Sequence, residues 1–123
     1  MSHSIALVED DLIIQQMYRT SLELRGYKVQ IACNGIEGLK LLRSNEPDLI
    51  LLDIKMPVMG GDEMLRIMRA DQRYAHLKVF LLTNLSKDEA PSCLRLLHVD
   101  RYIVKAHHTP SQIIQMIQET LDK

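Results

Sequence analysis

Four apolar runs in this chain each end on a polar residue, and this pattern constrains the fold more than any other feature. The runs and the residues that follow them are Ile5–Val8 with Glu9 and Asp10, Leu49–Leu52 with Asp53, Val79–Leu82 with Thr83, and Tyr102–Val104 with Lys105. Unbroken apolar runs of this length are typical of strands buried on both faces of a parallel sheet. Because parallel strands all end at one edge, we expect these polar residues to gather there.

The three carboxylates expected at this edge indicate a candidate metal site. Carboxylates crowded together repel one another unless a cation lies between them. Oxygen ligands of this kind suit a hard divalent metal ion. Glu9, Asp10 and Asp53 are therefore predicted to be metal ligands.

Helical patterns alternate with the strand patterns along the whole chain. Helices are expected over Asp11–Arg25, from Asn34 until Pro47 stops the helix, over about Gly61–Asp71, from Asp88, and from Thr109, with one more short strand at Lys28–Ala32. Gly26 suits a left-handed C-terminal cap of the first helix. Thr109 is followed by Pro110 and Gln112, which is the pattern of a capped helix start.

Five strands alternating with five helices predict a doubly wound α/β fold. Such sheets bind ligands beyond the carboxyl ends of their strands, where the strand order reverses. The expected ligand edge is the same edge at which the polar residues collect. A length of 123 residues allows one domain with a substantial core.

The composition excludes several functional classes. Apolar and charged fractions of 46% and 25% are those of an ordinary soluble globular protein. A formal net charge of −1 gives no footprint for nucleic acid or an anionic membrane. No apolar run approaches the ~20 residues needed to span a bilayer. The first four residues lack the features of a signal peptide, so we expect a cytoplasmic protein.

Neither the cysteines nor the histidines indicate a site of their own. Cys33 follows the second predicted strand and Cys93 falls in the fourth predicted helix, so we expect two reduced, partly buried thiols and no disulfide. The adjacent pair His107-His108 projects in two directions. It has no nearby Cys or spaced His to complete a zinc ligand set.

The stretch Leu52–Gly61, which reads LDIKMPVMGG, resembles the phosphoacceptor segment of response-regulator receiver domains. The resemblance covers essentially the whole chain, because the other strand ends match the family's motifs in order and at the same spacing. It implies a flavodoxin-like, five-stranded parallel sheet in the order 2-1-3-4-5. It also implies a single receiver domain over residues 1–123, with no effector domain in the sequence.

The resemblance assigns the candidate site residue by residue. Asp53 corresponds to the aspartate that accepts a phosphoryl group from a phosphohistidine. Glu9 and Asp10 correspond to the acidic pair that holds Mg²⁺, together with Asp53 and the backbone carbonyl of Lys55. Carboxylates with room for water and phosphate oxygens suit Mg²⁺.

Three further positions carry family roles. Thr83 corresponds to the hydroxyl residue that hydrogen-bonds a phosphoryl oxygen, and Lys105 to the ammonium that pairs with another. Phosphoryl transfer depends mainly on such positioning and charge neutralisation. Tyr102 corresponds to the aromatic switch that follows the movement of Thr83.

These roles imply a phosphorylation-dependent signalling switch of a two-component system or phosphorelay. It would not be an enzyme in the usual sense, although it would assist its own phosphorylation and dephosphorylation. The expected partners are a histidine kinase or histidine phosphotransfer protein, and a downstream protein that binds the face formed by the fourth helix, fifth strand and fifth helix. Homodimerisation on phosphorylation would be compatible with this face, and no direct contact with nucleic acid or membrane is expected.

Other interpretations compete with this one. Singly, Asp10 or Asp11 can cap a helix, and Lys105, Thr83 and Tyr102 can be ordinary strand-end residues; we assign the cap to Asp11. As a whole, the chain could be a pseudo-receiver that binds partners without phosphorylation, but no site residue is missing. A haloacid-dehalogenase-like phosphatase needs a second aspartate where Lys55 stands.

The chain departs from the family pattern at a few positions. Ala106 follows Lys105 where the family usually has a proline, often after a cis bond, so the loop is expected either to be rebuilt around a trans bond or to carry strain. Asn84 is larger than the usual residue after the hydroxyl position. His98-Val99 replaces a common Gly-Ala. The departures cluster on the predicted output face.

Overall fold

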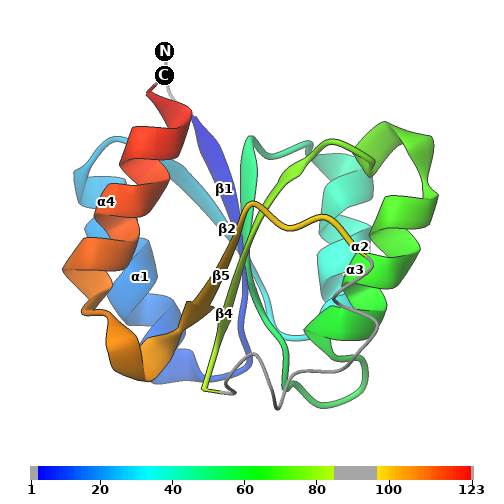
Figure 1. The fold of residues 1–123 in the computed structure, drawn as a ribbon, viewed down its shortest axis with the longest axis horizontal. Coiled ribbons are helices and arrows are strands. Elements are labelled where there is room, and N and C mark those ends of the chain that lie inside the picture. The colour runs from blue at the N-terminus through cyan, green and yellow to red at the C-terminus, as the bar shows by residue number, and fades with distance from the viewer. Residues whose placement is uncertain (1–2, 85–96, 123) are drawn as a thin grey trace.

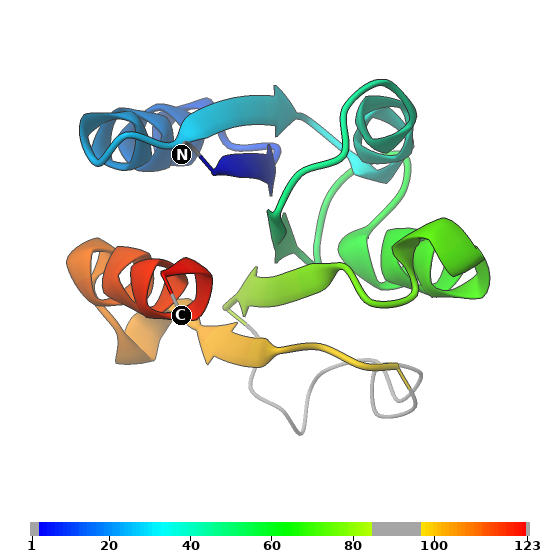
Figure 2. The same ribbon diagram turned by 90° about the horizontal axis from the view of Figure 1, so that it is seen from above.

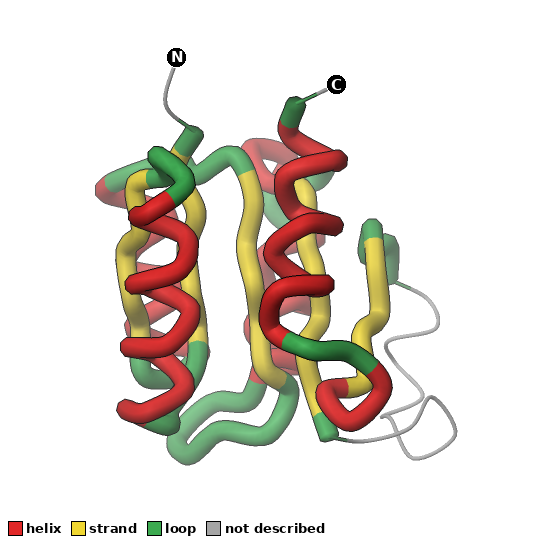
Figure 3. Tube along the Cα trace, turned by 90° about the vertical axis from the view of Figure 1, so that its left-hand side faces the viewer, coloured by secondary structure: helices red, strands yellow, loops and turns green. Residues whose placement is uncertain are grey.

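A computed structural model describes residues 3–84 and 97–122 and shows three layers with a parallel sheet in the middle (Figure 1). The strands are β1 (Ser4–Val8), β2 (Lys28–Ala32), β3 (Leu49–Asp53), β4 (Lys78–Thr83) and β5 (Arg101–Val104). The α-helices of the described residues are α1 (Leu12–Leu24), α2 (Gly35–Ser44), α3 (Gly61–Ala70) and α4 (Pro110–Leu121). Helices α1 and α4 lie side by side over one face (Figure 3), and α2 and α3 cover the other.

The sheet order is β2-β1-β3-β4-β5, and every neighbouring pair is parallel. This confirms the predicted doubly wound fold, and Figure 2 shows β2 and β5 at the two edges. The chain leaves β1 toward β2 on one side and returns to β3 on the other. The crevice beyond the ends of β1 and β3 is therefore the switch point at which folds of this type bind ligands.

Two apolar clusters, one on each face of the sheet, stabilise the fold. Strand residues alternate between them, because successive side chains point to opposite faces. One cluster packs Ile5, Leu7, Leu49 and Leu51 against α1 and α4, and it includes the buried α4 residues Ile113, Ile114, Ile117 and Leu121. The other packs Val8, Ile50, Leu52 and Leu81 against α2 and α3, and it includes the α3 residues Met64, Leu65 and Met68.

The ends of α1 and the start of α4 have the capping residues that the sequence predicts. The Asp11 side chain accepts hydrogen bonds from the backbone N–H groups of Ile13 and Ile14, so the cap assigned to Asp11 is confirmed. Gly26, just after α1, has φ +91°, a conformation that only glycine adopts without strain. Thr109 and Gln112 form a reciprocal capping box at the start of α4.

Some details differ from the expectations. Cys33 is exposed rather than partly buried, because it lies beyond the last paired residue of β2. The helix expected from Asp88, together with Cys93, lies outside the described residues, so the helix predicted as the fifth is α4 of the structure. Within the described ranges no helix is long and apolar enough to cross a bilayer.

Of the two expected arrangements at Lys105–Ala106, a trans bond or a strained cis bond, the structure has the trans bond. No cis peptide bond occurs among the described residues, so this bond is trans. Residues Lys105–His107 form a short 3₁₀ helix between β5 and α4. Ala106 thus lies inside this short helix, on a trans bond.

Candidate functional site at the carboxyl edge of the sheet

The carboxyl edge of the sheet brings the predicted site residues together around one cavity of about 420 Å³. Its lining comes from segments far apart in the sequence: Glu9, Asp10, Asp11, Ile14, Asp53, Lys55, Thr83, Asn84 and Lys105. The parallel register explains this convergence, because β1, β3 and β4 end side by side. Of the predicted site residues, only Tyr102 lies outside the lining.

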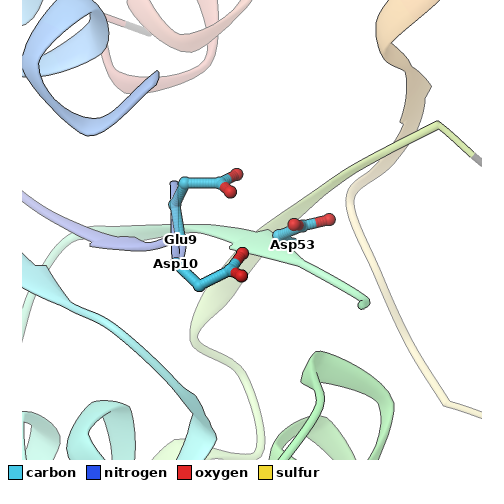
Figure 4. A group of neighbouring side chains, drawn as sticks. All are labelled: Glu9, Asp10 and Asp53. Atoms are coloured by element: carbon cyan, nitrogen blue, oxygen red, sulfur yellow. The ribbon is translucent and has the colours of Figure 1, made fainter. Parts of the chain in front are cut away.

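Glu9, Asp10 and Asp53 form an acidic cluster whose carboxylate oxygens converge (Figure 4). One ligand atom from each residue lies within 4.8 Å of the others. Glu9 and Asp53 are only 2% and 7% exposed, whereas Asp10 is open to solvent. Two buried carboxylates and one exposed carboxylate can bind a hard cation while leaving part of its coordination shell to water or to another oxygen donor.

The Lys105 ammonium partly neutralises this cluster from the β5 side. Its Nζ lies 3.2 Å from Glu9 Oε2, within hydrogen-bond distance, and 3.8 Å from Asp53 Oδ2. The three side chains are 17%, 3% and 9% exposed respectively, so water screens these attractions weakly. Lysine is therefore a fixed positive charge at the cluster rather than a solvated strand-end residue.

Burial makes the two inner carboxyl groups easier to protonate than usual. The pKa of Glu9 is raised to about 7, mainly by desolvation and then by the Asp53 charge, against which Lys105 acts. Desolvation also raises the pKa of Asp53, while Lys105 and the backbone N–H of Ile54 oppose the rise. Glu9 is therefore partly protonated near neutral pH, and a divalent ion would compete with protons for the cluster.

The loop after β3 holds Asp53 in place. The backbone N–H of Ile54 donates to Asp53 Oδ1 at 2.8 Å, and the N–H of Gly61 donates to the Ile54 carbonyl at 2.8 Å. A Cβ on Gly61 would lie only 2.0 Å from the Asp53 carbonyl oxygen, so this close approach requires glycine. Val58 at the loop tip has φ 68°, a strained conformation for a β-branched residue.

Thr83 and Tyr102 occupy the neighbouring strands β4 and β5. Thr83 is 1% exposed at the end of β4 and borders the cavity. Tyr102 is half-buried, is paired with Leu81 in the register, and packs against the cluster on the α2 and α3 face. The two residues are therefore on adjacent strands, with Tyr102 farther from the acidic cluster than Thr83.

The sequence interpretation missed one buried polar residue at the site. Gln15, in the first turns of α1, is 3% exposed and donates from Nε2 to the backbone carbonyl of Glu9. The signal available in the sequence was a polar residue on the inward side of an amphipathic helix, at helical spacing from Tyr18 and Leu22. This pattern alone does not show that Gln15 hydrogen-bonds to Glu9.

Comparison with known proteins agrees with the geometry. A family model described as the response regulator receiver domain matches residues 5–118. The polar-differentiation response regulator DivK of Brucella anthropi is 31% identical over 121 residues, which cover 98% of each chain.

Two solved structures show the same architecture. A CheY-like receiver domain protein from Methanospirillum hungatei superposes with a TM-score of 0.87 at 31% identity, covering 99% of this chain and 95% of that chain. The response regulator TrrA of Thermotoga maritima, solved in complex with Mg²⁺-BeF, gives a TM-score of 0.81 at 28% identity, covering 95% and 97%.

Proposed function

This chain belongs to the family of response-regulator receiver domains, and we propose that it is a phosphorylation-dependent signalling switch with Asp53 as the phosphoacceptor. One observation carries the proposal: a nearly buried Asp53 carboxylate faces two further acids and, 3.8 Å away, the ammonium of Lys105. A carboxylate in this setting can act as a nucleophile on phosphorus. The Lys105 ammonium and a metal ion bound by the acids would offset the negative charge of the incoming phosphoryl group.

In the proposed reaction, a carboxylate oxygen of Asp53 forms a bond to the phosphorus of a phosphohistidine. The N–P bond breaks, and its electron pair leaves on the imidazole nitrogen of the donor. Asp53 then carries an acyl phosphate, which water can later hydrolyse. The Ile54 N–H donates to Oδ1 at 2.8 Å and so orients the carboxylate before the reaction.

The donor set fits a divalent cation such as Mg²⁺. Glu9, Asp10 and Asp53 supply carboxylate oxygens, and we assign the backbone carbonyl of Lys55 as a further ligand. When bound, Mg²⁺ would offset the negative charge of the acids and the phosphoryl group. The protein holds the three carboxylates close together in a partly buried pocket. The ion pair between Lys105 and Glu9 reduces the electrostatic repulsion that this arrangement causes.

We assign Thr83 and Lys105 to the phosphorylated state. The Thr83 hydroxyl can donate to a phosphoryl oxygen, and the Lys105 ammonium can move its pairing from the acids to another phosphoryl oxygen. Movement of Thr83 would free space beside β5 into which Tyr102 can turn. This change shifts a population between two conformations, so both exist before phosphorylation.

The proposed partners follow from this chemistry. The phosphodonor is a histidine kinase or a histidine phosphotransfer protein, and the output partner binds the face that includes β5 and α4. We further propose that residues 1–123 act as a single receiver domain in the cytoplasm, and that phosphorylation can promote pairing of two copies. The complex of TrrA with Mg²⁺-BeF supports the proposal that a receiver domain of this fold binds Mg²⁺ together with a phosphoryl group, since beryllium fluoride is a mimic of that group.

A direct test incubates the protein with Mg²⁺ and a small phosphodonor such as acetyl phosphate and measures the intact mass. We expect one added phosphoryl group, no addition when a chelator removes Mg²⁺, and no addition for Asp53→Asn, which nearly preserves side-chain volume. An unmodified wild-type protein would instead favour a constitutive interaction module. Equal phosphorylation of Asp53→Asn would move the acceptor elsewhere.

A further inference from the structure

Four polar or charged side chains are buried in the described part of the chain, and three of them are site residues. Those three are Glu9, Asp53 and Thr83; the fourth is Gln15 of α1, which is 3% exposed. A buried amide is stabilised only when it is hydrogen-bonded, so its partners show what it does. The partners of Gln15 lie beside the acidic cluster.

The Gln15 amide nitrogen donates to the backbone carbonyl of Glu9 and lies 3.6 Å from Cys33 Sγ. The orientation of the amide follows from its partners, because a backbone carbonyl can only accept a hydrogen bond. The nitrogen, not the oxygen, must therefore face Glu9. Cys33, just beyond β2, provides a second, weaker acceptor for the same amide nitrogen.

The Glu9 carbonyl belongs to the peptide bond that joins Glu9 to Asp10. Glu9 lies one residue beyond β1, where its N–H still donates to the Ala32 carbonyl at 3.0 Å. The Asp11 N–H donates to Glu9 Oε1 at 3.2 Å. With the bond from Gln15, three successive peptide units between β1 and α1 each have a hydrogen bond.

We infer that Gln15 is a positioning residue: by fixing the Glu9–Asp10 peptide plane, it aims the Glu9 and Asp10 carboxylates at the cation shared with Asp53. The inference rests on the proposed metal site. The two torsions on either side of this peptide unit, ψ of Glu9 and φ of Asp10, set the direction of one side chain relative to the other, so restraining the unit restrains how the two carboxylates face each other. Restraining it before the cation arrives reduces the conformational entropy lost on binding.

The side chain must be a neutral donor of this length to do so. Leucine has a similar volume but leaves the Glu9 carbonyl without its donor. Glutamate has the same shape, but it replaces the donor with a further negative charge next to three acids. Methionine reaches as far as glutamine and fills the space without donating.

The test is Mg²⁺ titration by calorimetry of the wild type, Gln15→Leu and a matched control, Leu22→Ala. Leu22 is a fully buried residue of the same helix, and its truncation destabilises the fold without touching the β1–α1 loop. Circular dichroism establishes that each protein is folded during the titration. We expect Gln15→Leu to bind Mg²⁺ about tenfold more weakly, the order of magnitude for loss of a supporting hydrogen bond around a metal, and Leu22→Ala to bind as the wild type does.

A second arm separates positioning from a general effect on the fold. In an Asp10→Asn background, the loss caused by Gln15→Leu should shrink, because one of the two carboxylates that Gln15 aims is then neutral. If Gln15→Leu does not fold, Gln15→Met takes its place.

The outcomes distinguish the inference from the proposal beneath it. Wild-type affinity in the folded Gln15 variant, or an equal loss in Leu22→Ala, would overturn the positioning role while leaving the metal site intact. Failure of the wild type itself to bind Mg²⁺ would overturn the proposed metal site, and the positioning role with it.

Discussion

Lys105 Nζ lies 3.2 Å from Glu9 Oε2 and 3.8 Å from Asp53 Oδ2, so one ammonium from the β5 end serves two carboxylates from β1 and β3. This arrangement lowers the repulsion within the acidic cluster. In the proposed phosphorylated state, the same ammonium can pair with a phosphoryl oxygen on Asp53 instead. The charge balance of the site therefore depends on a residue 96 positions from Glu9 in the sequence.

Removing this ammonium should make Glu9 still easier to protonate. In Lys105→Met, the pKa of Glu9 should rise above its value of about 7, because the Lys105 charge now lowers it. An NMR titration that follows the Glu9 carboxyl carbon measures this. Lys78→Met, which removes an exposed lysine at the opposite end of β4, is the control. An unchanged Glu9 pKa in Lys105→Met would show that the ion pair does not exist in solution.

The buried acids should make the metal-free protein less stable as the pH rises. Glu9 has a pKa of about 7 in the folded state against an ordinary value of 4.5, so the folded state binds more protons between these values. Stability should therefore fall as the pH rises through this window, by up to about 3 kcal/mol. Asp53, whose pKa is also raised, acts in the same direction.

Urea unfolding between pH 5 and 8 measures this trend, and Glu9→Gln separates the contribution of Glu9 from that of Asp53. We expect a shallower fall in Glu9→Gln than in the wild type. Saturating Mg²⁺ should oppose the trend, because the cation favours ionised carboxylates. Parallel pH profiles for the two proteins would contradict the assignment of the raised pKa to Glu9.

Asp10→Asn should weaken Mg²⁺ binding several-fold and slow phosphorylation, since it removes one ligand charge. It should also stabilise the metal-free protein slightly, because it relieves repulsion in the cluster. Asp11→Asn is a matched control: it removes a neighbouring charge, while asparagine still caps α1. Equal Mg²⁺ affinities for the two variants, measured by calorimetry, would argue against Asp10 as a ligand.

Gly61→Ala should destabilise the protein and displace Asp53, the proposed phosphoacceptor. The new methyl would meet the Asp53 carbonyl at 2.0 Å, so the loop after β3 must move. We expect a loss of about 1–3 kcal/mol, the usual cost of overpacking, together with slower phosphorylation. Gly38→Ala is the comparison, because a Cβ there would meet side chains of Met64 and Val8 rather than backbone. Denaturant unfolding that ranks Gly38→Ala as the more harmful change would refute this account of the loop.

The sequence was sufficient for the sheet, because buried parallel strands leave long apolar runs that end in polar residues. It also placed Asp53, Thr83 and Lys105 at one edge, since parallel strands can end nowhere else. It did not show that Gln15 reaches Glu9, because that contact depends on how α1 packs over the sheet. Nor could it settle the conformation after Lys105, where Ala106 permits a 3₁₀ turn on a trans bond.

Phosphorylation should change the surroundings of Tyr102. Thr83 and Tyr102 lie on neighbouring strands, so movement of the Thr83 hydroxyl toward a phosphoryl oxygen would alter the space beside Tyr102. NMR spectra with and without Mg²⁺ and beryllium fluoride should show shifts of the Tyr102 ring signals, and Thr83→Ala should reduce them. Shifts confined to the loops around Asp53 would refute this coupling.

The identity of the modified residue tests the central claim most directly. Borohydride reduces an aspartyl phosphate to homoserine, so the protein is phosphorylated with acetyl phosphate and Mg²⁺, reduced, digested and mapped by mass spectrometry. We expect homoserine at position 53, and only when the phosphodonor is present. Conversion at another aspartate, or none in protein that carries an added phosphoryl group, would contradict it.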